Sequence, residues 1–180
     1  MNYFEYFYPE IKNIFNKETI NYCYRLISLY NNFIYELRKG IPSDFYKKRK
    51  EGENENYLCE IIRMKKTKEF IVHINKNNLS LDSYIPKSIF ETNPLFLKEN
   101  QIKIIEYAAF FGSNEIIKYI HNEGIEIPSS IWYYAIHSGN AELIQYLEDE
   151  QIPPPENDYE NSLRESIKSH HNDVSNYIIN

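Results

Sequence analysis

Glycine and cysteine are both scarce in this chain of 180 residues. Loops that cradle a nucleotide phosphate need several glycines, because the backbone must approach the ligand closely, and the chain has only 5. The 2 cysteines, Cys23 and Cys59, have no CxxC spacing and no secretory context. We interpret them as core residues of a reduced protein, and we expect an intracellular, cytoplasmic location.

Long apolar runs and excess positive charge are also missing. No segment approaches the roughly 18 consecutive apolar residues that a membrane-spanning helix needs. The aromatic N-terminus carries Glu5 and Glu10 and has no basic region, which argues against a signal peptide. The formal net charge of −6 argues against binding to a phosphate backbone. We therefore expect neither a membrane nor a nucleic acid as a partner.

The chain does contain strong helical periodicity, and it begins in residues 1–56. Pro9 suits the first turn of a short helix. From Ile20 to Leu37, apolar residues recur at steps of three and four, which predicts one long amphipathic helix ending before Gly40. We expect this N-terminal region to cap the rest of the protein, with the aromatic residues 3–8 packed on the long helix. The alternative is that these aromatic residues form an arm that binds a membrane surface or a partner.

A basic run interrupts this region and introduces a charged segment without apolar periodicity, residues 47–56, which predicts a surface loop. Its first four residues fit a monopartite nuclear-import signal, and the alternative is a solvated turn, because three glutamates follow within five positions. The basic residues are Lys47, Lys48, Arg49 and Lys50.

An internal repeat occupies residues 57–180. Residues 108–128 align with residues 135–155 at an offset of 27, with 8 identical residues in 21 positions. A third copy covers residues 166–178, and a degenerate first copy around residues 62–74 aligns Glu69 with Glu115. We divide the region into copies at 57–80, 101–128, 129–156 and 157–180, with a connecting segment at 81–100.

Each copy predicts two helices joined by a tight turn. Small residues mark the first helix, at Ala108, Ala135 and Ser166, and the turns follow at Gly112 and Gly139. A single helix pair cannot bury its own apolar face, so the pairs must stack on one another. The sequence therefore predicts an all-α fold in which helix pairs form a solenoid.

The segment AAFFGSNEIIKYIHNEGIEI, residues 108–127, resembles an ankyrin repeat. The Thr-Pro-Leu-His signature of ankyrin repeats is absent, and the 27-residue spacing is shorter than the usual 33 or so. The β-turn fingers of ankyrin repeats are therefore in doubt. Residues 57–180 are more closely similar to an ankyrin-like family of unicellular parasites, a domain without an assigned function. The segments that carry this similarity are SIFETN, IEYAAFFGS, WYYAIHSGNAELI and SIKSHHNDVSNYI.

This resemblance implies an ankyrin-like scaffold that binds an unknown protein and is not an enzyme. Members of the family often continue into further ankyrin repeats, and Ile178 and Ile179 leave an apolar end. We therefore expect either such repeats or self-association at the C-terminal end. A structural, self-assembling unit and an enzyme with an unrecognised site remain alternatives.

Partner-contact residues follow from the same resemblance. Ankyrin-like stacks usually bind through non-core positions of the first helix in each pair and through the connecting fingers. The alternative is that Phe110 or Phe111 belongs to the core, because two exposed adjacent phenylalanines would lower solubility. The candidate contact residues are Tyr107, Phe110, Phe111, Tyr134, His137 and Ser138.

We predict no catalytic residue, cofactor or metal site. Adjacent residues of a helix point about 100° apart, so His170 and His171 cannot readily bind one ion. We place them in the turn of the last copy, with His171 capping the helix that begins near Asn172. His73, His121 and His137 have no Cys, Asp or Glu at ligand spacing.

Overall fold

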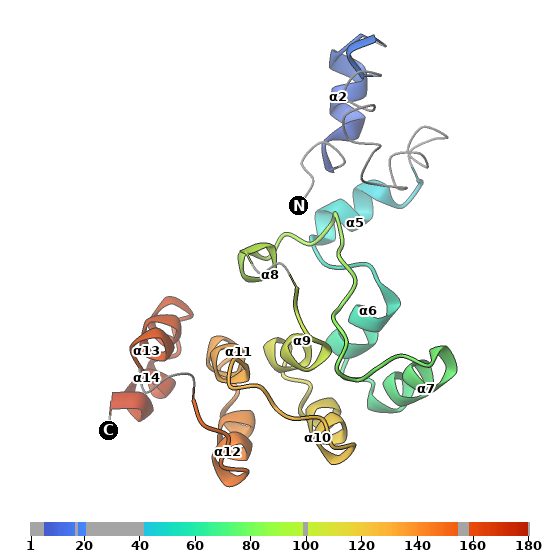
Figure 1. The fold of residues 1–180 in the computed structure, drawn as a ribbon. Coiled ribbons are helices and arrows are strands. Elements are labelled where there is room, and N and C mark those ends of the chain that lie inside the picture. The colour runs from blue at the N-terminus through green and yellow to red at the C-terminus, as the bar shows by residue number, and fades with distance from the viewer. Residues whose placement is uncertain (1–5, 17, 21–41, 99–100, 155–158, 180) are drawn as a thin grey trace. The chain divides into compact units, whose positions relative to one another are not determined.

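The computed structural model describes residues 6–16, 18–20, 42–98, 101–154 and 159–179. It divides into two compact units, Met1–Glu55 with Lys87–Asn100, and Asn56–Pro86 with Gln101–Asn180. The described residues form helices and no strand, and Tyr84 and Lys103 make an isolated β-bridge. The prediction of an all-α fold is confirmed for this part of the chain (Figure 1).

The first unit contains three described helices, α2 (Tyr8–Ile14), α5 (Phe45–Glu51) and α8 (Pro94–Lys98). Pro9 lies in the first turn of α2, as predicted. The long helix predicted between residues 20 and 37, with Cys23, falls outside the described residues apart from Ile20. The packing predicted for the aromatic residues 3–8 falls largely outside them too, and the described Phe7 is 44% exposed.

The basic run is helical, so the prediction of a surface loop over residues 47–56 is wrong for its first half. Helix α5 buries Phe45 and ends at Gly52, whose φ of 68° is left-handed. The pairs Asp44–Lys48 and Lys47–Glu51 lie at i,i+4 on its surface. The Arg49 guanidinium donates two hydrogen bonds to the Glu10 carboxylate, at 2.6 and 2.9 Å.

Residues 87–100 belong with this first unit, whereas the sequence placed 81–100 among the repeats. The rings of Phe45 and Phe90 lie edge to face with their centroids 5.3 Å apart. The Thr92 amide and hydroxyl both donate to the carbonyl of Gly52, at 3.0 and 2.9 Å. Aromatic and hydrogen-bond contacts of this kind leave no signal in the local sequence pattern.

The described part of the second unit contains four consecutive helix pairs. The first helices of the pairs pack in chain order, α6 against α9, α9 against α11 and α11 against α13, while α7 and α10 also pack together (Figure 1). The pairs are α6 (Tyr57–Arg63) with α7 (Thr67–Asn77), α9 (Ile104–Phe110) with α10 (Asn114–Asn122), α11 (Ile131–His137) with α12 (Ala141–Asp149), and α13 (Tyr159–Lys168) with α14 (Asn172–Ile179).

Small residues lie where these first helices pack. Ala108 and Ala135 are fully buried, and Ser166 is also 0% exposed, with its hydroxyl 2.8 Å from that of Ser175. Trp132 is buried, and its indole nitrogen donates to the Ile152 carbonyl at 3.0 Å. Cys59 is likewise a core residue, with no exposed surface.

The same backbone turn joins the two helices of every pair. The turn residue has a left-handed φ, between 56° and 66°, in all four pairs. The next amide donates to a carbonyl five residues back, as in a Schellman motif, at 2.8 to 3.0 Å. The turn residues are Lys65, Gly112, Gly139 and His170.

This turn corrects the alignment of the first copy by one residue. Aligning Glu69 with Glu115 would place Lys66 beside Gly112, but the left-handed residue is Lys65. Lysine rarely adopts a left-handed conformation, so the sequence does not mark this turn.

Candidate functional site

A groove of about 700 Å³ crosses the turns of the first three helix pairs in the second unit. Four of the six predicted contact residues line it, namely Phe110, Phe111, His137 and Ser138. The other lining residues are Lys65, Thr67, Gly112, Ser113, Asn114, Glu115, Asn140 and Glu142. Four of the contact residues that the ankyrin resemblance implied therefore lie on one concave surface.

An aromatic wall forms one part of the groove. The rings of Phe110 and His137 stack with centroids 4.8 Å apart and planes 20° from parallel. Phe111 meets Phe110 edge to face at 4.9 Å. Both phenylalanines are half-buried, so neither belongs wholly to the core. The His137 Nδ1 atom lies 3.1 Å from the Ser169 hydroxyl, which ties the wall to the fourth pair.

Two predicted contact residues are not on the surface. Tyr107 has no exposed area and Tyr134 is 5% exposed, so placing them among the contact residues is corrected by the structure. Each directly precedes a buried alanine on a helix that packs between its neighbours. Tyr107 supports the wall from beneath, because its ring lies 4.8 Å from that of Phe111 and its hydroxyl accepts from Arg63 at 2.8 Å.

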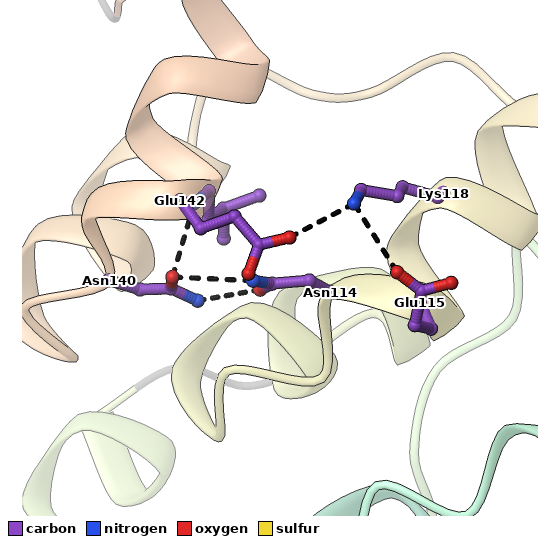
Figure 2. Close-up of polar contacts among 6 residues, drawn as sticks. Asn114, Glu115, Lys118, Asn140 and Glu142 are labelled. Carbon is purple, nitrogen blue, oxygen red and sulfur yellow. Dashed lines mark hydrogen bonds and ion pairs between the residues drawn. The ribbon is translucent and has the colours of Figure 1, made fainter.

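Two asparagines form the floor of the groove. The Asn140 side-chain amide donates to the Asn114 Oδ1 at 2.6 Å, and Asn114 returns a longer bond of 3.4 Å (Figure 2). The Asn140 Oδ1 also accepts from the Leu143 amide at 3.1 Å, which caps α12. Each asparagine thereby holds a fixed position at the start of the second helix of its pair.

Because Gly112 has no side chain, the floor of the groove is unfilled between these asparagines and the first helix pair. A Cβ atom built on Gly112 would lie 3.3 Å from the Asn140 Nδ2 and 3.4 Å from the Lys65 Nζ. An ammonium group from the first pair and an amide from the third therefore converge over one glycine of the second. Both groups are hydrogen-bond donors.

A charged edge borders the groove on the second helices. Lys118 of α10 pairs with Glu115 at 3.3 Å and with Glu142 of α12 at 3.0 Å (Figure 2). The hydrogen bond from Lys118 is the main cause that lowers the pKa of Glu142, followed by one from Asn114. The same contacts, led by the bond to Glu142, raise the pKa of Lys118. These groups are exposed, so the pairs order side chains more than they stabilise the fold.

The histidines make contacts between helix pairs. His170 lies in the turn and His171 directly precedes α14, as predicted, with its backbone carbonyl accepting from the Ser175 amide at 3.0 Å. The His171 side chain reaches the third pair, where its Nε2 donates to the His137 carbonyl at 3.0 Å. His121 Nδ1 lies 2.7 Å from the Tyr146 hydroxyl. Within the described ranges, no three residues among His, Cys, Asp and Glu gather in a way that could hold a metal ion.

A second, smaller hollow of about 530 Å³ lies on the first helix pair. Tyr57, Val72 and His73 line it, and Tyr57 and Val72 are 49% and 64% exposed. Because it lies on α6 and α7 and shares no lining residue with the groove, it offers matched control positions.

Sequence reasoning missed Lys65, Asn114, Asn140 and the charged edge. The repeat alignment contained a signal for Asn140, because it directly follows a turn glycine where helix caps are common. It contained none for Lys65, whose turn is not marked by glycine.

No family model matches the chain, and neither a protein of curated function nor a solved structure matches it. In the described part of the chain, no helix combines the length and the apolar character needed to cross a membrane.

Proposed function

We propose that this protein is an interaction module that binds a partner protein through the groove lined by Phe110, Phe111, His137 and Ser138. The observation that carries the proposal is the position of these residues. They come from two consecutive helix pairs and line one concave surface together with Lys65 of a third pair.

We also propose that the second unit is an ankyrin-like solenoid of the family that the sequence resembles. Two observations support this. The turn of every pair has the same left-handed residue and the same backbone hydrogen bond, and the first helices pack in chain order. Among the described residues no β-hairpin joins the pairs, and in this respect they differ from ankyrin repeats.

The composition of the groove favours a protein over a small molecule as partner. Half-buried aromatic rings offer a large contact area at a low entropic cost, and such residues carry much of the binding energy at protein interfaces. Polar groups at the rim, among them Ser138 and Glu142, can make hydrogen bonds that define the register of a partner.

The test is affinity capture from the native cell with three versions of the chain. The first is the wild type, the second carries Phe110→Ala with His137→Ala, and the third carries Tyr57→Ala with Val72→Ala in the second hollow. Thermal unfolding of each version shows that it is folded. The proposal expects one set of proteins to be captured by the first and third versions and lost with the second. Capture that is unchanged in the second version would refute this site.

Self-association is a second candidate, and one observation favours it. Ile167 of α13 is 57% exposed on the last described helix pair, so a contact between copies of the chain at this pair would bury apolar surface. The side chains of Ile178 and Ile179, on which the sequence prediction rested, fall outside the described residues.

A further inference from the structure

The opening over Gly112 suggests what the partner presents to the groove. This step rests on the proposed function. The Lys65 ammonium and the Asn140 amide nitrogen both lie within 3.4 Å of the point where a Cβ of Gly112 would be. Two donors from different helix pairs thus face one small space, which any side chain at this position would fill.

The Lys65 ammonium and the Asn140 amide differ in the ion pairs and hydrogen bonds that they already make. Among the described residues no carboxylate lies within ion-pair distance of Lys65, although its charge is near enough to help lower the pKa of Glu142, after the larger effects of Lys118 and Asn114. Lys118 instead pairs directly with both Glu115 and Glu142. The Asn140 amide has two N–H groups and gives one to Asn114. An incoming carboxylate has two oxygens and several lone pairs, and can accept from an ammonium and an amide together.

The backbone conformation of Lys65 also supports a binding position over Gly112. Its φ of 56° is one that lysine rarely adopts, and glycine occupies the equivalent turn in the second and third pairs. Lys65 is exposed as a whole, but its ammonium lies at the edge of the groove, 3.4 Å from the point where a Cβ of Gly112 would be.

We propose that the groove recognises a peptide segment of the partner in which an acidic residue is adjacent to a large apolar one. The acidic side chain binds over Gly112, between Lys65 and Asn140, while the apolar side chain packs on Phe110 and His137. The chain carries a net charge of −6, so long-range attraction does not favour an acidic partner. Recognition of the acidic residue is therefore a short-range effect that acts in the bound state.

The experiment begins with random linear peptides displayed on phage and selected on the full chain. Peptides that lose binding to the Phe110→Ala, His137→Ala variant are kept as groove binders and synthesised with a fluorescent label. Each is made with its acidic residue and with the corresponding amide, Asp→Asn or Glu→Gln. Fluorescence anisotropy at physiological ionic strength then gives the Kd of every pair.

The decisive variant is Lys65→Gly, because it removes the ammonium and suits the left-handed turn. His170→Gly is the matched control, since it relieves the same conformation in the fourth pair and does not line the groove. Neutralising the peptide acid should weaken binding about 3- to 10-fold in the wild type and in His170→Gly, as expected for a partly exposed charged hydrogen bond. In Lys65→Gly it should change the Kd by less than about 2-fold.

Two results would overturn the inference and leave the proposed function intact. One is a set of groove binders without a shared acidic residue, and the other is an equal loss on neutralisation in the wild type and in the Lys65→Gly variant. If selection yields no peptide that depends on Phe110 and His137, both the inference and the proposed peptide-binding groove fail.

Discussion

Phe110 and His137 occupy the same position in consecutive helix pairs and stack on each other, with ring centroids 4.8 Å apart. Repeat alignment places them 27 residues apart, the offset that also aligns Gly112 with Gly139. Equivalent positions of neighbouring pairs thus meet directly, and this meeting builds the aromatic wall of the groove.

The first prediction concerns the energy of this contact. Changing Phe110 and His137 to Ala, singly and together, should give a double-mutant cycle with a coupling energy of about 0.5–1 kcal/mol, as for other stacked rings. Urea unfolding followed by circular dichroism measures it. Additive effects of the two changes would mean that the rings do not stack in solution.

The second prediction concerns the turn glycines. A Cβ on Gly139 would lie 2.5 Å from a ring carbon of His171, whereas a Cβ on Gly124 would meet nothing within 4 Å. Both residues have a positive φ. Gly124→Ala should therefore cost about 1–2 kcal/mol from backbone conformation alone. Gly139→Ala should cost about 1 kcal/mol more, because the His171 ring must leave the His137 carbonyl.

A further substitution, His171→Ala, tests whether the His171 ring causes the extra cost at Gly139. Adding His171→Ala to Gly139→Ala removes the clash, so the penalty specific to Gly139 should shrink in the double variant. Thermal or urea unfolding of the single and double variants measures these costs in stability. Equal costs for Gly124→Ala and Gly139→Ala would place the His171 ring elsewhere.

The third prediction concerns acid stability. The bond from Lys118 lowers the pKa of Glu142 in the folded state, so this contact stabilises the fold above the ordinary carboxyl range, near pH 4 to 4.5. The contribution is lost as the pH falls through the lowered pKa. Glu142→Gln should therefore be slightly less stable than wild type at neutral pH, by no more than an exposed ion pair contributes, and the difference should vanish in acid.

Urea unfolding between neutral pH and about pH 3 measures this dependence, across the range in which carboxylates titrate. Glu126→Gln, at an exposed position between α10 and α11, is the control for loss of a negative charge. A difference between wild type and Glu142→Gln that persists at the acid end would show that the carboxylate contact is not its source.

The sequence was sufficient to predict the helix pairs of the second unit. Apolar spacing and paired small residues marked the helices, and glycine marked two of the turns. The candidate contact residues Phe110, Phe111, His137 and Ser138 came from the resemblance to ankyrin repeats, and the structure places these four on one groove.

The other features of the fold and the site could not be predicted, because they depend on tertiary contacts that local sequence patterns do not indicate. Tyr107 and Tyr134 are amphipathic side chains, and only the packing of neighbouring helices decides that both are buried. The turn at Lys65 and the contact of His171 with His137 are set by tertiary structure. Helix α5 was predictable in principle, since Asp44–Lys48 and Lys47–Glu51 are i,i+4 pairs before a glycine.

The fourth prediction addresses self-association. If the last helix pair mediates contact between copies of the chain, Ile167→Glu should make a concentration-dependent oligomer monomeric without a loss of helicity. Sedimentation velocity over a concentration series measures it, and Val72→Glu, at a similarly exposed residue of α7, is the matched control. A chain that is monomeric at every concentration would remove this candidate.

The most direct test of the central claim is photo-cross-linking in the native cell. A photoreactive amino acid replaces Ser138 in the groove or, as the control, Val72 in the second hollow. A groove that binds a partner protein predicts a discrete cross-linked product from position 138 that is absent from position 72 and is lost when Phe110→Ala is added. No product from position 138, or the same product from both positions, would contradict the account.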